Sequence, residues 1–375
     1  MGRVTVERNI SFDDVRKRYY VTFDFGVVDG KQIRKVKTFA RLTDARKALR
    51  LHEAERVNGT SVTPKSITVG EWLDYWMENI SAHKNEESTL YGYRLIIENH
   101  IKPAMGDVQL QALKPKMMQE YYSEKYKTLT QNTVRRHHDL LRNAFQVAFR
   151  NGEIASNPFD KVSPPIPKKK DIQFYNEEQV KKLLIVCKGN RLEIPIKLGI
   201  YLGLRRGEIC GLKWSNVDFE NKVITINSTR TTVGSKVITK GTKSETSKRK
   251  AFMPDDLLET LAEEKQRQEE AKAIYGDGYK DGDYVFVWDN GEPYRPNYLS
   301  ELFTKFIADA GLPPITLHGL RHSFAAIANK AGVSLYDISK TLGHSSTSIT
   351  SDTYIHVIDS AHKETIQKVE SLLNK

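Results

Sequence analysis

The chain has 375 residues, of which 39% are hydrophobic and 28% are charged. This length exceeds what a single hydrophobic core usually supports, so two or three domains are expected. No apolar run approaches the roughly 18 residues that a membrane-spanning helix needs, and the N-terminal stretch MGRVTVERNISF lacks the features of a secretory signal. We therefore expect a soluble, multidomain, cytoplasmic protein. Its only cysteines, Cys187 and Cys210, lie in apolar patterns and are predicted to be buried thiols.

The net charge of +11 favours a polyanionic partner, because Lys and Arg placed on phosphates release condensed counterions. Residues 1–60 contain fourteen Lys and Arg against eight Asp and Glu, an excess of six positive charges (14 − 8). An anionic membrane surface would attract the same charge, so the charge favours nucleic acid without excluding a membrane. Its concentration near the N-terminus indicates a DNA-binding arm.

Strand-like alternation in RYYVTFDFGV and QIRKVKTF, separated by VDGK, predicts a β-hairpin between Arg18 and Phe39. A helix that closes this unit is expected from Thr43, its candidate N-cap. A two- or three-stranded sheet of this kind inserts its face into a DNA groove, whereas a solvated charged sheet is the alternative. The basic residues expected on or beside the sheet are Arg16, Arg18, Arg34, Lys35 and Lys37.

A polar linker starts at Asn58, and four helices are predicted after it. The first begins at Thr68, the second (STLYGYRLIIENHIKPAMG) is ended by Pro103 and Gly106, the third lies around Met117 and the fourth runs from Thr133. A polar run on the fourth helix faces either DNA phosphates or water; it consists of Arg135, Arg136, His137 and His138. The next segment, from Asn157, has four prolines and the triplet Lys168, Lys169 and Lys170, which predicts a stiff basic linker and a domain boundary.

The second half of the chain is predicted to be mostly helical with one small sheet. Strands are expected around 222–228, 236–240 and 249–253, and in DYVFVW, which starts at Asp283. Gly332 and Gly343 stand where C-cap glycines occur. Helices are expected at 176–188, 191–203, 254–274, 296–310, 317–331, 335–342, 346–354 and from 360.

Polar residues interrupt the apolar patterns at turns and helix ends. In GLRRGE, Arg205 follows an apolar helix with Glu208 one turn away, so its guanidinium either pairs with Glu208 or awaits an anion. Lys243 lies in the connection between two expected strands, where a lysine either reaches a DNA groove or only aids solubility.

In TLHGLRHSF, Thr316 is a candidate N-cap that places His318 and Arg321 on the first helical turn, where helix amides also favour phosphate. His318 and His322 have the spacing of a zinc pair, but no further ligand stands at a usual spacing. His344 follows in LGHSS and Tyr354 in SDTYIHV; an isolated tyrosine of this kind is usually a packed ring.

Six of these residues, taken in chain order, resemble the catalytic set of the tyrosine recombinase (phage integrase) family. The matching segments are GLRRGEI, HGLRH, LGHSS and DTYIH, and the resemblance covers 175–375. The six residues are Arg205, Lys243, His318, Arg321, His344 and Tyr354. The N-terminal layout is similar to integrases of temperate phages and of integrative conjugative elements of Gram-positive bacteria.

The resemblance implies a role for each of these residues. Arg205 and Arg321 would hold the scissile phosphate, and His344 would donate a hydrogen bond to it. Tyr354 would attack phosphorus to form a 3′-phosphotyrosine, Lys243 would protonate the leaving 5′-oxygen, and His318 would accept the tyrosine proton. Phosphodiester is exchanged for phosphodiester, so no ATP, metal or other cofactor is expected; no phosphate-cradling loop and no cluster of Asp and Glu accompanies the motifs.

The resemblance also implies a fold that is mainly α with small β-sheets. It has an arm-type DNA-binding domain (1–60), a helical SAM-like core-binding domain (66–158), a basic linker (159–174) and a catalytic domain (175–375). The implied partners are double-stranded DNA attachment sites and three further copies of the chain on a Holliday junction, in the cytoplasm at the bacterial nucleoid. Whether a directionality factor and a host DNA-bending protein also take part is left open by the sequence.

The sequence leaves several alternatives open. The C-terminal segment HKETIQKVESLLNK, an amphipathic helix, packs either on its own domain or on a neighbouring subunit. Two other functions are a type IB topoisomerase-like DNA-relaxing enzyme and a catalytically inert, architectural DNA-binding protein. The target sequence, the control of direction, and a phage or a conjugative transposon as the origin are not determined.

Overall fold

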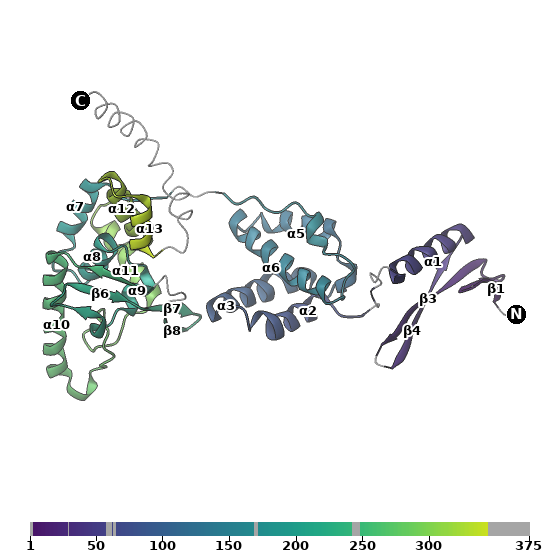
Figure 1. The fold of residues 1–375 in the computed structure, drawn as a ribbon, viewed down its shortest axis with the longest axis horizontal. Coiled ribbons are helices and arrows are strands. Elements are labelled where there is room, and N and C mark those ends of the chain that lie inside the picture. Colours follow the sequence, from purple (N-terminus) through teal and green to yellow (C-terminus); the bar gives the residue numbers. More distant parts are fainter. Residues whose placement is uncertain are drawn as a thin grey trace, which may run out of the picture. The chain divides into compact units, whose positions relative to one another are not determined.

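The computed structural model describes residues 3–28, 30–57, 62, 65–168, 172–241 and 248–343. The chain divides into two compact units, residues 1–169 and 170–375 (Figure 1). No helix of the described residues is long and apolar enough to cross a membrane.

The first unit begins with a four-stranded antiparallel sheet in the order β1-β2-β3-β4. Its strands are β1 (Val4–Glu7), β2 (Ile10–Asp13), β3 (Arg18–Val28) and β4 (Lys31–Phe39). The predicted hairpin between Arg18 and Phe39 is confirmed, and Gly30 has φ +75° in its turn. The prediction of two or three strands was wrong, because β1 and β2 also pair onto the sheet. Each has only four residues, too few for their alternation to stand out.

Helix α1 (Leu42–Val57) covers one face of this sheet. It begins one residue before Thr43, so the predicted Thr43 cap was wrong. A small core of Ile10, Val21, Phe23 and Ala45 lies between the helix and the sheet. The ring of His52 from α1 packs edge-on against Phe23, which fixes the helix on that face.

A helical module follows the sheet. Its elements are α2 (Val69–Trp76), η1 (Met77–Ser81), α3 (Glu87–Ile96), η2 (Ile97–Ile101), α4 (Lys102–Met105), η3 (Leu110–Ala112), α5 (Pro115–Lys125), α6 (Gln131–Arg150) and η4 (Pro158–Lys161). Thr68 caps α2 in a capping box with Glu71, and Thr130 caps α6. The buried rings of Trp72, Trp76 and Phe145 form the centre of its core.

The second predicted helix of this module passes through a proline. Pro103 lies in the first turn of α4, directly after the π-helical turn η2, so the prediction that Pro103 helps to end the helix was wrong. In the π turn Lys102 N donates to Ile97 O, five residues back. This wider turn relieves the clash that a proline ring makes in a regular helix, and Gly106 caps the end.

The second unit is mainly helical with small sheets. Its helices are α7 (Glu177–Val186), α8 (Glu193–Tyr201), α9 (Arg206–Gly211), α10 (Asp255–Tyr275), α11 (Pro296–Asp309), α12 (Leu317–Lys330) and α13 (Leu335–Leu342), with 3-10 turns η5 (Trp214–Asn216) and η7 (Gly276–Gly278). Its strands are β5 (Val217–Asp218), β6 (Val223–Ile226), β7 (Ser228–Val233), β8 (Lys236–Gly241) and β9 (Arg249–Phe252).

Two expectations for this unit were wrong. The strands form a three-stranded sheet, β5-β6-β9, and a separate two-stranded sheet, β7-β8, instead of one sheet. DYVFVW forms only isolated bridges, from Tyr284 to Lys213 and from Val287 to Pro293. Its apolar side chains Val285 and Phe286 are buried from a loop, which produces the same pattern as a strand. The helices predicted at 346–354 and from 360 lie outside the described residues.

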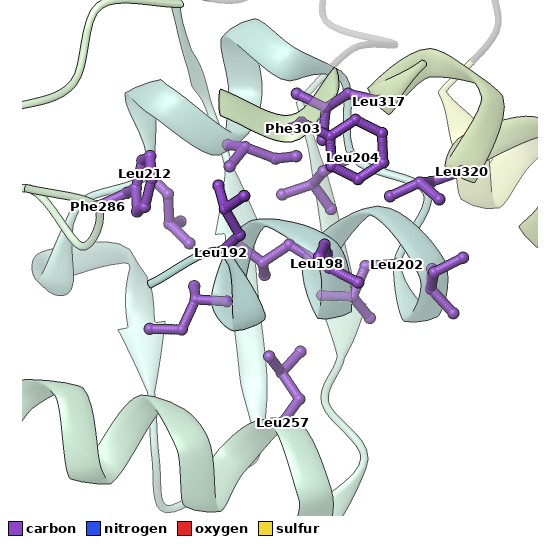
Figure 2. Close-up of a cluster of buried hydrophobic side chains, with 14 of the residues drawn as sticks. Leu192, Leu198, Leu202, Leu204, Leu212, Leu257, Phe286, Phe303, Leu317 and Leu320 are labelled. Carbon is purple, nitrogen blue, oxygen red and sulfur yellow. The ribbon is translucent and has the colours of Figure 1, made fainter. Parts of the chain in front are cut away.

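Helix α8 lies at the centre of the second unit and contacts α7, α9, α10 and α12. Figure 2 shows Leu198 from α8, and Leu202 directly after it, among side chains of the surrounding elements, including Leu257, Phe303 and Leu320. Both cysteines belong to this core, as predicted, and burial raises the pKa of each thiol to about 12. The apolar helix α8 thus provides a rigid support for the polar turn that follows it.

Candidate active site

Arg205 lies in the turn between α8 and α9. Gly203 in this turn has φ +60°, and a Cβ atom there would collide with Leu342 Cδ2, so the position requires glycine. Arg205 is the N-cap of α9, and Glu208 Oε2 accepts a hydrogen bond from Arg205 N at 2.9 Å. Arg205 Nη1 also donates to Glu208 Oε1 at 2.9 Å. The ion pair that the sequence offered is therefore present, and the Arg205 side chain nevertheless stays 37% exposed.

Glu208 holds a second arginine. Arg249, the first residue of β9, donates from Nη1 to Glu208 Oε1 at 3.1 Å and from Nη2 to Oε2 at 2.9 Å. Burial would raise the pKa of Glu208, but the hydrogen bonds and charge of Arg249, followed by those of Arg205, lower it to about 2. Sequence reasoning missed Arg249, because it stands in the basic run KRK, which is typical of a solvated strand end.

Arg321 lies on α12, whose predicted cap is confirmed by the 3.1 Å bond from Gly319 N to Thr316 Oγ1. Its side chain is only 1% exposed. Nη1 donates to Gly203 O at 2.6 Å and Nη2 to Leu342 O at 2.8 Å. Arg321 therefore fastens α12 to the turn before Arg205 and to the end of α13.

The two arginines meet at the end of α13. Arg205 Nη2 donates to Gly343 O at 3.3 Å, the carbonyl after the one that Arg321 binds. Gly343 has φ +66° and caps α13, as predicted. The described chain stops there, one residue before His344.

His318 stands beside the two arginines on the first turn of α12. His318 is an exposed residue, but desolvation by the surrounding protein lowers its pKa, and Arg321 and Arg205 lower it further. The His322 ring lies edge-on to it, 4.6 Å away between centroids. Burial, with smaller effects from His318 and Arg321, lowers the pKa of His322 to about 4. No group of three or more metal-ligating side chains occurs among the described residues, and the zinc reading has no third ligand there.

A groove of about 540 Å³ extends from Arg205 and His318. Arg206 forms part of its wall and donates from Nη1 to Ser300 Oγ at 2.9 Å. Five hydroxyl-bearing residues also line the groove: Thr229, Thr231, Ser300, Thr304 and Thr316. Hydroxyl and guanidinium groups suit phosphate oxygens, and sequence reasoning missed Arg206 because Arg205 beside it carried the motif.

Three of the six predicted catalytic residues, Lys243, His344 and Tyr354, lie outside the described residues. The other three, Arg205, His318 and Arg321, are brought together by α9, α12 and the end of α13. The assignment of all six as catalytic stays a prediction.

The chain was compared with known proteins. Residues 173–361 match the Phage integrase family, a span of 189 residues (361 − 173 + 1) that is just over half of the chain. Residues 68–126 match the Phage integrase N-terminal SAM-like domain. The chain belongs to the phage integrase family.

Individual proteins agree with this membership. The chain is 29% identical over 335 residues to a "Tyrosine recombinase XerC-like" protein of Caldanaerobacter subterraneus subsp. tengcongensis, covering 84% of this chain and 86% of the relative. It is similar in fold to the Tn1549 transposon integrase in complex with a circular intermediate DNA (TM-score 0.69, 22% identity, 80% and 99% covered). It is also similar to a lambda integrase tetramer bound to a Holliday junction (TM-score 0.56, 18% identity, 92% and 97% covered).

The chain is thus a tyrosine site-specific recombinase of the integrase type, and the resemblance and the fold class read from the sequence are confirmed. The inert DNA-binding reading and the topoisomerase reading are not favoured by these relatives. The four domain boundaries stay predictions; the structure itself divides near residue 169.

The sheet of the recombinase separates its candidate DNA-binding residues into two sets. Lys35 pairs across the strands with Phe23, and Lys37 with Val21, so both lysines lie on the α1 side. Arg34 pairs with Asp24, and Arg18 with Asp13, so both arginines lie on the opposite, open face. Arg16 is exposed in the turn before β3, and a hydrogen bond to Tyr20 raises its pKa. All five cations are exposed, so their role in DNA binding stays a prediction.

The polar run on α6 does not form one surface. His137 and His138 are buried, and their Nδ1 atoms lie 2.9 and 2.8 Å from the hydroxyls of Tyr121 and Tyr122 in hydrogen bonds. The expectation that these histidines face DNA or water was therefore wrong, because both rings are buried inside the helical module and bind tyrosine hydroxyls there.

The remaining basic candidates differ in their surroundings. Arg136 is exposed, while Arg135 pairs with Asp139 at 2.9 Å. Lys168 is exposed, and Lys169 and Lys170 lie outside the described residues.

Proposed function

We propose that this recombinase integrates and excises a mobile DNA element by cutting and rejoining strands through a 3′-phosphotyrosine at Tyr354. The observation that carries this proposal is that Arg205 and Arg321 meet at the end of α13, with His318 and Arg205 lining one groove, in a chain of the phage integrase family. Tyr354 follows this point by eleven residues (354 − 343).

The chemistry needs positive charge that does not move as the reaction proceeds. As Tyr354 attacks phosphorus, negative charge builds on the two non-bridging oxygens, and Arg205 and Arg321 would neutralise it. Arg321 is fixed by two carbonyls and Arg205 by Glu208 and Gly343, so neither guanidinium needs to reorganise. His344 would add a hydrogen bond to the same phosphate.

Proton transfers complete the exchange of one phosphodiester for another. His318 would accept the proton of Tyr354, and the lowered pKa of His318 keeps its imidazole neutral for that role. Lys243 would give a proton to the departing 5′-oxygen, which stays free for the reverse attack. The bond energy is retained in the protein–DNA bond, so this reaction requires no ATP, metal or other cofactor.

The DNA would contact the chain beyond the scissile phosphate. The groove beside Arg205, with Arg206 and its hydroxyl lining, is suited to the neighbouring backbone. In the first unit, the open face of the sheet with Arg18 and Arg34 would bind arm-type sites in a groove. Arg16, Lys35 and Lys37 would hold flanking phosphates, as would Arg135, Arg136 and the lysines at 168–170.

The assembly would contain four copies of the chain on paired attachment sites, joined through a Holliday junction. The lambda integrase tetramer on such a junction, which this chain resembles in fold, supports this proposal. A directionality factor and a host DNA-bending protein would set the direction of the reaction. The substrate then places the protein in the bacterial cytoplasm, at the nucleoid.

A suicide substrate tests the proposed reaction. The purified chain, without metal or ATP, is incubated with a nicked duplex that carries its element's end, and covalent adducts are separated on a denaturing gel. The wild type is expected to form an adduct, and Tyr354→Phe none, because phenylalanine has no nucleophile. Tyr336→Phe, which removes the hydroxyl of an exposed tyrosine on α13, is the matched control and should react like the wild type.

An adduct that persists in Tyr354→Phe would contradict the assignment of the nucleophile. Tight binding without any adduct would contradict the reaction and favour the inert DNA-binding function. Relaxation of supercoiled plasmids that lack an attachment site would favour the topoisomerase-like function instead.

A further inference from the structure

We propose that Arg249 is a positioning residue for strand cleavage, which acts on Arg205 through the shared carboxylate of Glu208. The proposal rests on the proposed function, because it assigns Arg205 to the scissile phosphate. Arg249 does not belong to the six predicted catalytic residues and lies in a different element from each of the three that the structure describes, at the start of β9.

Two arginines bind the Glu208 carboxylate and hold it in one orientation. Arg249 binds both carboxylate oxygens, from Nη1 at 3.1 Å and from Nη2 at 2.9 Å. Arg205 binds the same two oxygens, Oε1 through its Nη1 and Oε2 through its backbone N–H, each at 2.9 Å. A two-pronged grip by Arg249 fixes the plane of the carboxylate, and this plane then determines where the Arg205 guanidinium can lie.

Exposure distinguishes the two arginines. The Arg249 side chain is 7% exposed and Glu208 is 4% exposed, whereas the Arg205 side chain is 37% exposed. Both Nη atoms of Arg249 are engaged by Glu208, while Arg205 can present its remaining donors to a phosphate. The two guanidinium groups have different tasks: one holds the carboxylate, and the other faces the substrate.

Charge balance gives a reason for the second arginine. An isolated Glu208 carboxylate would draw the Arg205 guanidinium to itself and compete with the phosphate for it. With Arg249 in place, the three side chains carry a net positive charge of one (two arginines, one carboxylate), which remains available to the phosphate. Arg249 thus lets Glu208 position Arg205, while it weakens the competition of Glu208 with the phosphate for the Arg205 guanidinium.

The position of Arg249 in the sheet adds a further link. Arg249 of β9 pairs with Ile226, and Gly241 of β8 pairs with Ser228, so both ends of the connection that contains Lys243 are held along residues 226–228. The bond from Arg249 to Glu208 fastens one of these ends to α9.

A double-mutant cycle on the full chain tests the proposal. Single-turnover cleavage of the suicide duplex is measured for the wild type, Arg249→Met, Arg205→Lys and the double variant, with DNA affinity and thermal unfolding recorded in parallel. Arg249→Met should cleave about 10²-fold more slowly while its DNA affinity changes by less than about threefold, because oriented charge is lost and binding surface is not. In the Arg205→Lys background the same change should cost less than about threefold, because the guanidinium that it orients is already absent.

Two further variants keep the test decisive. Lys250→Met removes an exposed cation from the same strand and should cleave like the wild type. Arg249→Lys keeps the charge without the two-pronged grip and should recover cleavage to within about tenfold of the wild type. Should Arg249→Met fail to fold, or the Arg205→Lys rate fall below detection, the Arg249→Lys rate decides.

The proposal would be overturned if Arg249→Met slowed cleavage equally in the wild-type and Arg205→Lys backgrounds, or if Arg249→Met cleaved like the wild type. It would also be overturned if Arg249→Met lost DNA affinity as much as it lost cleavage rate. An Arg249→Lys rate as low as that of a folded Arg249→Met would have the same consequence. Should Arg249→Met not fold, an Arg249→Lys rate more than about tenfold below the wild type would overturn it. Failure of the wild type to form any adduct would instead contradict the proposed function, so the two failures can be told apart.

Discussion

The cations of the two units are held in opposite ways. On the N-terminal sheet, Arg18, Arg34, Lys35 and Lys37 are exposed, and the ion pair between Arg34 and Asp24 spans 3.9 Å. In the second unit, Arg321 and Arg249 are enclosed and bound by carbonyl or carboxylate oxygens at 3.1 Å or less.

This difference reflects two uses of positive charge. Exposed cations lose little on binding DNA and gain by releasing counterions, so they suit affinity and sliding. Enclosed cations are costly to bury, and their partners hold them in one place, which suits a transition state whose charge appears at one point. The comparison predicts that the two kinds of residue fail in different assays.

The largest effect is expected for Arg321→Met. The change leaves the carbonyls of Gly203 and Leu342 without this buried donor, which should destabilise the chain by about 3 kcal/mol, and cleavage should fall by a factor on the order of 10³. Urea unfolding and single-turnover cleavage measure the two effects. Arg267→Met, which removes a half-exposed arginine paired with Glu264 and Asp289, is the matched control and should cost less than about 1 kcal/mol.

Equal stability of Arg321→Met and Arg267→Met would contradict the view that the cations of the active site are structurally fixed. A stable Arg321→Met chain that still cleaves would contradict the role of Arg321 at the phosphate.

A smaller effect on the cleavage rate is expected for His318, which should set how that rate depends on pH. Its pKa is lowered from 6.5 by desolvation first, and then by Arg321 and Arg205. A lowered pKa means that the imidazole stays neutral, and able to accept a proton, as the pH falls through 6.5. Single-turnover cleavage should therefore stay level down to this pH and decline only below it, and His318→Ala should be slower by about 10²-fold. A decline in the wild type centred above pH 6.5 would show that another group is the base.

The smallest effect on stability is expected for Arg34→Ala on the open sheet face. The side chain is exposed, so the free energy of unfolding should change by less than about 0.5 kcal/mol. Binding to arm-site DNA should weaken, and the slope of log K against log salt should become shallower by about 0.9 if one phosphate contact is lost. Arg46→Ala, on α1 and bound to Glu7, is the control and should keep the wild-type slope. An unchanged slope for Arg34→Ala would place the arm-site contacts away from the open face.

The sequence predicted those features that depend on local chemistry. The hairpin around Gly30, the cap at Thr316 and the C-cap glycine Gly343 each follow from a few neighbouring residues. The grouping of Arg205, His318 and Arg321 was predicted by the motif order, because the family places such residues together.

Other features depend on contacts between distant segments. Nothing near Arg249 in the chain indicates that it would meet Glu208, 41 residues away (249 − 208). His137 and His138 look like a surface run until α5 supplies the hydroxyls of Tyr121 and Tyr122. DYVFVW has a strand-like pattern, but a strand needs a partner, and this segment is buried without forming a ladder.

The central claim is that Tyr354 carries the DNA, and peptide mapping of the covalent adduct tests it most directly. Trypsin cuts after Lys340 and Lys363, and the peptide 341–363 contains Tyr354 as its only tyrosine. Mass spectrometry of the nuclease-trimmed adduct is expected to find the nucleotide on this peptide, with fragmentation placing the phosphate on Tyr354. A nucleotide on another peptide, or on a serine of this one, would contradict the account.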